Sequence, residues 1–316
     1  MDMENLVFSL NATVPVFLLM VLGLLFRKLG WIDEAFASKM NKFVFLIPLP
    51  VKVFLDLAKV DFAKAWNGKF VLFCFGVTVL SITIVAFLSL LWKNRFIRGE
   101  FIQASYRSSA ALLGIAFIQN IYGNSGMAPM MIIGSVPLYN IMAVVVLSLF
   151  GQDKKAVDKK LILKTLKGIV TNPIIIGIVI GLLWSACSIP MPVILEKTAS
   201  NIGAVATPMG LMAMGATFDI RKAFGNIKPA MVATFIKLIG LCTIFLPIAI
   251  QFGFRDSELV AILVMLGSAT TVSCFVMAKN MGHDGVLSSS VVMLTTMFSA
   301  FTLTGWLYLL KSMMLI

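Results

Sequence analysis

The sequence predicts an all-α integral membrane protein with ten transmembrane helices, arranged as two inverted repeats of five helices. Its composition, its apolar runs and an internal repeat carry this prediction. Of 316 residues, 59% are apolar and 13% are charged, and the mean hydropathy is +0.99. Soluble domains are about 45–50% apolar, and a soluble fold of this length could not bury so much apolar surface. A soluble enzyme, a nucleic-acid-binding domain and a disordered chain are therefore excluded.

A transmembrane helix needs about 20 mostly apolar residues, and the chain contains ten runs of this kind. The predicted spans are 6–26, 43–58, 69–92, 101–120, 127–150, 171–187, 200–218, 229–252, 258–279 and 286–309. We interpret the first run as a span and not as a signal peptide, because Asp2 and Glu4 precede it and the run is too long.

Lysine and arginine gather in alternate loops. If the N-terminus is outside, the inside loops contain roughly three times as many of these residues as the outside loops. This ratio favours both termini outside the cell. The residues of 151–168 form a short amphipathic connector between repeat 1–150 and repeat 169–316. We expect a multi-pass protein of the plasma membrane. We then assign its net charge of +12 to the cytoplasmic loops. The expected partner is the lipid bilayer, and we expect no binding to nucleic acid.

An offset of 158 residues relates the two halves of the chain. Thr13, Pro15, Gly23, Leu24 and Leu25 match Thr171, Pro173, Gly181, Leu182 and Leu183; Pro50 matches Pro208; and Asp61, Lys64 and Ala65 match Asp219, Lys222 and Ala223. Each half holds five spans, an odd number, so the halves should cross the membrane in opposite senses. Inverted repeats of this kind are typical of secondary transporters.

The sequence contains little that indicates a metal site or redox chemistry. The four cysteines stand far apart in or beside apolar runs, where we expect small buried hydrophobes: Cys74, Cys187, Cys242 and Cys274. His283 is the only histidine, and no spaced catalytic motif occurs. We therefore expect no metal site, no cofactor and no enzymatic activity.

The fourth and ninth spans have small and hydroxyl-bearing residues at their centres, at 104–114 and 267–273. Transporters with inverted repeats build midplane sites from broken helices, whose freed N-termini favour anions. Close packing of unbroken helices would explain the same residues. The candidate binding residues here are Arg107, Ser108, Ser109, Ala110, Gly114, Ser268, Thr270, Thr271 and Ser273. Neither centre holds a carboxylate, which argues against a cation antiporter.

Three further candidates lie in other spans. Lys52 stands about 15 Å along a helix from Lys42, near the middle of the membrane, after Pro48 and Pro50, which should bend the span. It is a counter-charge for an anion, or else it pairs with Asp56 and extends toward the surface. Tyr139 and Asn140 sit in mid-span, where a role beside a cavity explains them better than lipid contact. Lys237 also lies within a span, but its position there argues less strongly for a role in the site.

Several ordered motifs resemble the auxin efflux carrier family, which includes plant PIN carriers and bacterial malate and malonate carriers. They are Met40-Asn41-Lys42-Phe43-Val44 followed by Pro50, Val136-Pro137-Leu138-Tyr139-Asn140, Thr171-Asn172-Pro173 with Gly181-Leu182-Leu183, and Ser268-Ala269-Thr270-Thr271-Val272-Ser273. The resemblance covers essentially the whole chain. The chain departs from the family where Ser109, Ala110 and Ala111 replace an N-T-G element and where Ala116 and Ala269 replace prolines.

The resemblance implies a fold similar to sodium/proton antiporters and bile-acid symporters, with helices 4 and 9 crossing at the substrate. A scaffold of helices 1, 2, 6 and 7 would move against transport helices 3–5 and 8–10. It implies a transporter of a small organic anion, such as malate, malonate or an auxin-like acid, acting as an exporter. The alternatives are a sodium-coupled symporter of a bile-acid-like anion and a membrane sensor that does not transport. The oligomeric state, including a homodimer, stays open.

Overall fold

The structure, a computed structural model, describes residues 2–59, 67–110, 115–123, 126–150 and 167–316, and the regular elements that it describes are helices. The first half contains α1 (Asp2–Lys28), α2 (Glu34–Leu46), α3 (Pro48–Ala58), α5 (Gly68–Ser89), α6 (Arg95–Tyr106), α7 (Ile115–Tyr122) and α8 (Ala128–Leu149). The second half contains α10 (Pro173–Ala186), α11 (Val193–Ala204), α12 (Ala206–Thr217), α13 (Ile220–Gly225), α14 (Ile227–Phe235), the π-helical turn η2 (Ile236–Gly240), α15 (Leu241–Gln251), α16 (Asp256–Gly267), α17 (Ser273–Asn280) and α18 (Val286–Ser312).

Each predicted span overlaps a helix or a pair of consecutive helices, so the all-helical prediction is confirmed. In the described chain, four continuous helices are long and apolar enough to cross a membrane, namely Gly68–Ser89, Ala128–Leu149, Ile227–Gln251 and Val286–Ser312. Pro173–Ala186 is a shorter apolar helix. The connector falls largely on 151–166, outside the described residues.

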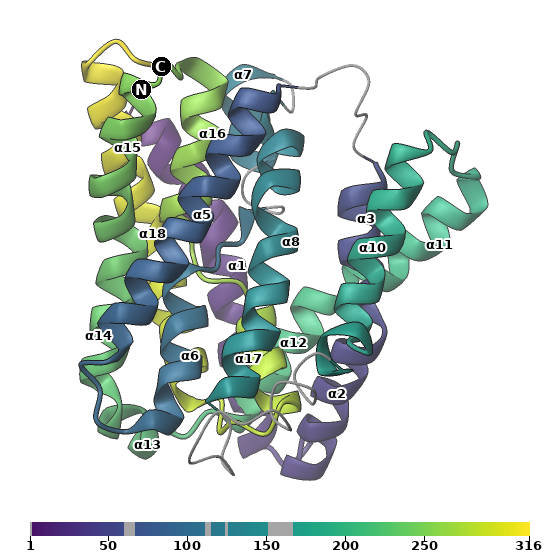
Figure 1. Cartoon of the computed structure of the whole chain (residues 1–316). Helices are drawn as coiled ribbons and strands as arrows, with labels where there is room; N and C mark the ends of the chain where they lie inside the picture. Colours follow the sequence, from purple (N-terminus) through teal and green to yellow (C-terminus); the bar gives the residue numbers. More distant parts are fainter. Residues whose placement is uncertain (1, 60–66, 111–114, 124–125, 151–166) are drawn as a thin grey trace.

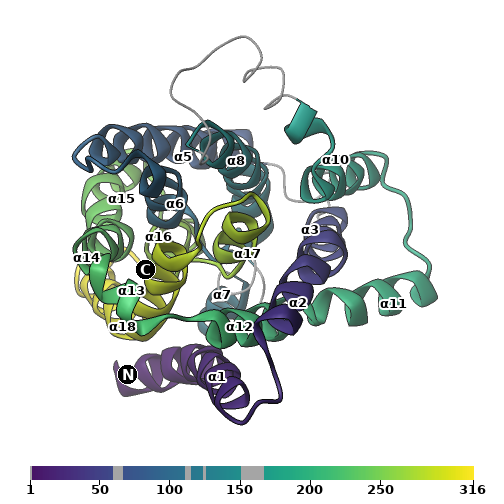
Figure 2. The same ribbon diagram turned by 90° about the horizontal axis from the view of Figure 1, so that it is seen from below.

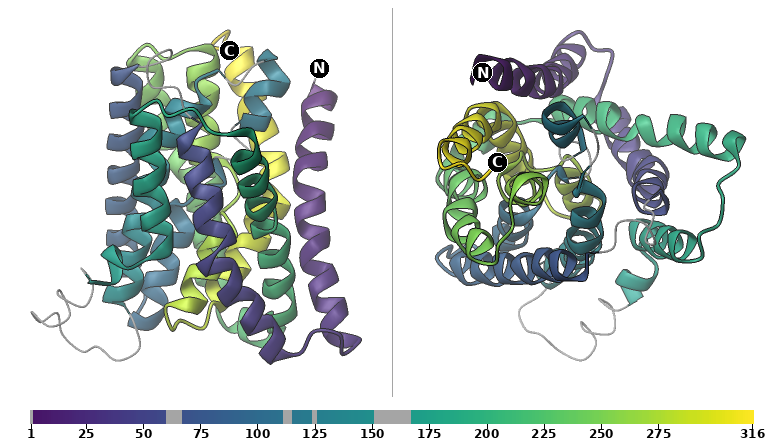
Figure 3. Two further views of the ribbon diagram at one scale, coloured as in Figure 1. Left: turned by 90° about the vertical axis from the view of Figure 1, so that its right-hand side faces the viewer. Right: turned by 90° about the horizontal axis from the view of Figure 1, so that it is seen from above.

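The helices form two groups (Figures 1 and 2). We call α1–α3 and α10–α12 the outer row, and α5–α8 with α13–α18 the bundle. Seen from below, the outer row curves along one side of the bundle (Figure 2). The N-terminus and the C-terminus lie at the same end of the molecule (Figures 1 and 3), as an even number of spans requires.

Within the outer row, each half of the chain packs against the other half. A Cβ added to Gly23 of α1 would lie 2.2 Å from the carbonyl oxygen of Met212 in α12. A Cβ added to Gly181 of α10 would lie 2.8 Å from the carbonyl oxygen of Phe54 in α3. The glycines are 158 residues apart, and so are Phe54 and Met212. The two contacts are therefore equivalent under the predicted repeat, and only glycine allows backbones this close.

A break divides the second helix of each half. α2 ends before Ile47, which has φ −125° and ψ −70°, and α3 begins at Pro48, so the predicted bend is confirmed. Val205, with φ −69° and ψ −23°, separates α11 from α12 at the equivalent position, again 158 residues later. This second break was not predicted, and α11 begins at Val193, before the start expected for the seventh span.

Three of the four cysteines, Cys74, Cys242 and Cys274, are buried as expected. The prediction is wrong for Cys187, which is exposed. This residue is the C-cap of α10, at the surface end of the helix, where its apolar neighbours no longer cover it.

Candidate functional site

Two helices of the bundle are interrupted where the sequence is rich in small residues. α6 ends at Tyr106 and α16 ends at Gly267, and residues 107–109 and 268–272 are not helical. The two breaks touch, because the backbone N–H of Ser109 donates to the carbonyl oxygen of Ala269 at 2.9 Å. The crossing of two broken helices is thus a feature of the described structure.

Side-chain hydroxyls bind the carbonyls that each helix end leaves free. Ser108 donates from Oγ to the carbonyl oxygen of Met265, the end of α16, at 2.5 Å. Thr270 donates from Oγ1 to the carbonyl oxygen of Ala104, the end of α6, at 2.8 Å. The last carbonyls of a helix have no partner within it, and in the membrane interior they must find one in the protein. The exchange of hydroxyls therefore stabilises both breaks.

Lys237 adds a positive charge to the crossing. It lies in η2 and is fully buried. Its ammonium donates to Ser108 Oγ and to the carbonyl oxygens of Leu266 and Met265, the latter at 3.3 Å. These three acceptors match the three N–H donors of an ammonium. Because the C-terminal end of a helix is electronegative, the charge of Lys237 is well placed at the end of α16.

Arg107 follows α6 and is also buried, but its contacts differ. Nη2 donates to Asn140 Oδ1 and to Ser273 Oγ, both at 2.8 Å, and Nη1 donates to Gln103 Oε1 at 3.4 Å and to Met277 Sδ at 2.9 Å. All four acceptors are neutral. Its Nε is buried without a hydrogen-bond partner among the described residues. The guanidinium thus keeps its charge uncompensated and one donor unused.

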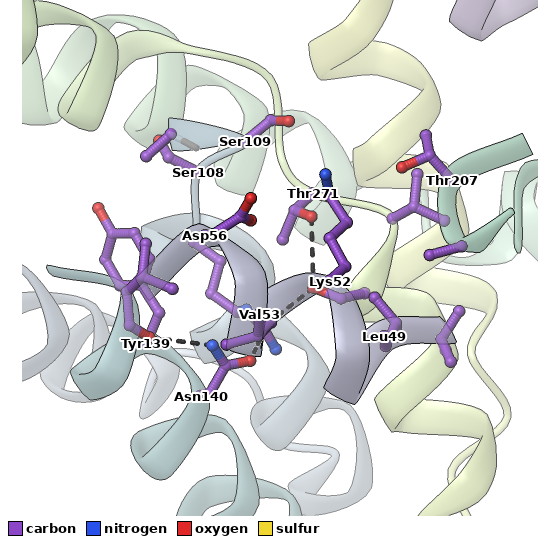
Figure 4. A pocket seen from close by; sticks show the side chains of 17 residues that line it. Leu49, Lys52, Val53, Asp56, Ser108, Ser109, Tyr139, Asn140, Thr207 and Thr271 are labelled. Atoms are coloured by element: carbon purple, nitrogen blue, oxygen red, sulfur yellow. Dashed lines mark hydrogen bonds between the residues drawn. The ribbon is translucent and has the colours of Figure 1, made fainter. Parts of the chain in front are cut away.

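A cavity of about 80 Å³ lies beside this guanidinium, between the outer row and the bundle (Figure 4). We call it the crossover cavity. The outer row lines it with residues of α3 and α12, namely Leu49, Lys52, Val53, Asp56, Ala206 and Thr207. The bundle lines it with Arg107, Ser108, Ser109, Ala110, Val136, Tyr139, Asn140, Thr271, Val272, Ser273 and Val276.

The outer row brings two charges of opposite sign to the cavity. Lys52 and Asp56 stand one helical turn apart on α3, and both side chains line the cavity near Thr271 (Figure 4). In the described chain they form no ion pair with each other; an ion pair forms instead just after α3, between Lys59 Nζ and Glu196 Oε1 of α11, 2.8 Å apart. The crossing itself lacks a carboxylate, as the sequence indicates, but the cavity contains Asp56.

Nine of the predicted site residues line the cavity: Lys52, Arg107, Ser108, Ser109, Ala110, Tyr139, Asn140, Thr271 and Ser273. Ser268 and Thr270 are buried in the crossing and do not line it. Gly114 lies outside the described residues.

Sequence reasoning missed the cavity role of Asp56 and gave too little weight to Lys237. A helical turn from Lys52 to Asp56 was the available signal for the first. For Lys237 the signal was its position within a span, because a lysine inside the membrane needs a stated partner.

Interrupted helices that cross inside a membrane protein, beside a cavity lined by a buried arginine, define a class of membrane transporters. A model of the membrane transport protein family, the auxin efflux carrier family, matches residues 8–307 of the chain. The chain therefore belongs to this family, which is one of transporters and not of enzymes, and the resemblance seen in the sequence is confirmed.

Individual relatives support this family membership. The chain is 25% identical over 324 residues to a provisionally named malonate transporter of Rhizobium meliloti, covering 95% of both chains. It is 20% identical over 308 residues to an uncharacterised transporter of Methanothermobacter thermautotrophicus, covering 94% of this chain and 97% of the other. A sodium/proton antiporter of Methanocaldococcus jannaschii has the same fold, with a TM-score of 0.62 at 13% identity, over 96% of this chain and 98% of the antiporter.

Proposed function

We propose that the protein is a secondary transporter that exports a small organic anion, a carboxylate such as malonate or malate, by alternating access. The observation that carries this proposal is Arg107. A buried guanidinium that faces a cavity with neutral partners only and a free Nε–H is costly unless an anion completes it. A carboxylate fits because a hydrogen bond between a guanidinium and a carboxylate is charge-assisted and stronger than one to a neutral acceptor.

The surroundings of Arg107 support an anion too. Ser273, the first residue of α17, lines the cavity, and a helix N-terminus carries partial positive charge. Lys52 adds a cation from the opposite wall. The name of the Rhizobium relative points to a dicarboxylate of three carbons, which makes malonate the first substrate to test.

The fold we propose has ten spans in two inverted repeats, with both termini outside the cell. The offset of 158 residues that relates the sequence halves also relates the starts of α3 and α12, at Pro48 and Ala206, and of α8 and α18, at Ala128 and Val286. α5 and α14–α15 run in opposite directions, because Lys69 at the start of α5 donates to the carbonyl oxygen of Phe252 after the end of α15.

Transport would follow an elevator movement of the bundle against the outer row, with helices 1, 2, 6 and 7 as scaffold and helices 3–5 and 8–10 as transport domain. The hydrogen bonds of the crossing, from Ser108, Thr270 and Lys237, all stay within the bundle. The cavity lies between the two groups. A rigid bundle can therefore carry its bound anion past a stationary α3.

The membrane potential can drive this export. Moving one charge through 100 mV is worth about 2.3 kcal/mol, and a negative cell interior expels anions. We therefore expect export of a monovalent carboxylate as a uniport that does not need sodium.

Asp56 favours a second candidate, the sodium-coupled symporter of an organic anion. Its carboxylate lines the cavity together with the hydroxyls of Thr271 and Ser109, and oxygen atoms of this kind bind hard cations. In that case Asp56→Asn should abolish the sodium dependence. A sensor of the same fold would bind the anion without moving it.

Flux in liposomes separates these candidates. Purified protein is reconstituted with radiolabelled malonate or a monocarboxylate inside, a potential is set with potassium and valinomycin, and efflux is followed with and without sodium. Potential-dependent efflux without sodium supports the uniport. A strict sodium requirement supports the symporter, and binding without flux supports the sensor. Preference for a cation would overturn the anion site.

A further inference from the structure

Two more cavities lie beside α13, away from the crossing. One has a volume of about 320 Å³ and is bounded by α1, α12, α13 and α18. Its walls are almost entirely apolar, with Leu24, Met214 and Met293 among them. The other has a volume of about 540 Å³ and lies between the turn from α5 to α6 and the start of α14. Its walls include Trp92, Lys93 and Lys228.

The two cavities adjoin each other, because Phe224 and Ile227 line both. Phe224 is 70% exposed and Ile227 is 39% exposed. Their side chains therefore form an apolar saddle between the two cavities. A single long molecule with one end in each cavity would cover this saddle.

The two cavities fit different kinds of chemical group. The residues that line the apolar cavity are uncharged, and they suit a hydrocarbon chain. The lining of the other cavity carries the cations of Lys93 and Lys228 and no carboxylate, and the Trp92 indole Nε1 is buried there without a partner among the described residues. An anionic group suits this end, so the occupant is an anionic amphiphile.

We propose that an anionic phospholipid binds here, with its phosphate between Lys93 and Lys228 and one acyl chain in the apolar cavity. The charges agree with the predicted cytoplasmic side, because the neighbouring helices α6 and α13 hold Arg95, Arg221 and Lys222, and basic pockets at the cytoplasmic surface bind anionic lipids. A free phosphate would leave the apolar cavity and the saddle uncovered.

The position of this lipid connects the two groups of helices. α1 and α12 of the outer row and α13 and α18 of the bundle bound the same apolar cavity. Relative movement of the groups would change its shape, so the lipid favours the arrangement with the intact cavity. By linkage, if the lipid changes the affinity for a substrate by some factor, that substrate changes the affinity for the lipid by the same factor.

The test measures lipid binding to the delipidated full-length protein. Tritiated or spin-labelled phosphatidylglycerol, phosphatidylcholine and glycerol phosphate are titrated in detergent, and thermal stability is followed in parallel. We expect phosphatidylglycerol to bind tighter than phosphatidylcholine and to stabilise the protein, and glycerol phosphate to do neither. Since each basic residue near a charged lipid contributes roughly fivefold in affinity, Lys93→Gln with Lys228→Gln should remove about 25-fold of the preference.

A matched control keeps the test specific. Lys39→Gln with Lys42→Gln removes the same charge from exposed positions of α2, on the same predicted side, and should leave the preference unchanged. Met293→Trp fills the apolar cavity and should weaken both lipids. Equal affinity for the two lipids, equal loss in the control, or stabilisation by glycerol phosphate alone would each overturn the proposal.

Discussion

Arg107 and Lys237 are both buried cations beside the crossing, yet their surroundings differ. Lys237 has an acceptor for each of its three donors, and two of these acceptors are carbonyls at the end of α16. Arg107 has neutral side-chain acceptors, an unused Nε–H and a place on the cavity wall. A cation whose donors all have acceptors stabilises the backbone, whereas a cation with an unused donor can bind a ligand. We therefore expect Lys237 to act on stability and Arg107 on binding.

The largest effect should come from Lys237→Met. The change leaves the carbonyls of Met265 and Leu266 with fewer donors, and each unsatisfied buried group costs about 1–3 kcal/mol. We expect a loss of stability of about 2–4 kcal/mol, measured by thermal or denaturant unfolding in detergent, and loss of flux for every substrate. Lys237→Arg, which keeps the charge, should recover part of the stability. Wild-type stability in Lys237→Met would contradict the structural role.

Arg107→Gln should act on the substrate instead. Hydrogen bonds to charged groups contribute about 1.5–3 kcal/mol, so carboxylate affinity should fall roughly 10- to 150-fold. Unfolding should change less than for Lys237→Met, because removal of a buried charge without a carboxylate partner offsets the loss of its neutral partners. Titration calorimetry with malonate measures the first effect and thermal unfolding the second. Arg107→Lys should bind with intermediate affinity, because a lysine keeps the positive charge but lacks the planar, rigid set of donors of the guanidinium. If Arg107→Gln binds malonate normally, the cation is structural and the comparison with Lys237 fails.

Lys52→Met should have a smaller effect of the same sign. Its charge lies on the wall of α3, which Asp56 shares, so its field on the ligand is partly cancelled. We expect carboxylate affinity to fall several-fold. Water in the site raises the effective dielectric constant, so the attraction between Lys52 and the carboxylate is weak. Lys59→Met, just after the same helix and in an exposed ion pair, is the control. An unchanged affinity would place the Lys52 charge outside the substrate site.

The smallest change expected is that of Thr270→Val, which removes one hydroxyl bond to Ala104. The cost should be about 1 kcal/mol in unfolding experiments, without loss of malonate affinity, because Thr270 does not line the cavity. Ser108→Ala should cost more, since Ser108 also accepts from Lys237. If Thr270→Val cost more than Ser108→Ala, the hydrogen bond from Lys237 to Ser108 would not add to the stability of the crossing.

The sequence was sufficient for the helices and for the breaks near Ile47, Ser109 and Ser268, because these depend on local composition, but not for the break at Val205. Apolar runs gave the spans, and small residues around Ser109 and Ser268 marked the breaks. The sequence could not tell which hydroxyls face the cavity, because this depends on how two broken helices are rotated against each other. Thr270 and Thr271 are neighbours, yet Thr270 binds a carbonyl and Thr271 lines the cavity.

The pairing of helices in the outer row has a consequence for biosynthesis. Arg27, at the end of α1, donates to the carbonyl oxygen of Ala216 in α12, 189 residues later. At about 5–20 residues per second, the ribosome needs roughly 10–40 s to supply that partner. During this interval α1 has no α12 to pack against, and the surface at Gly23 that later contacts Met212 is not covered by its partner helix. The first half of the chain therefore cannot complete its own fold before most of the second half has been made.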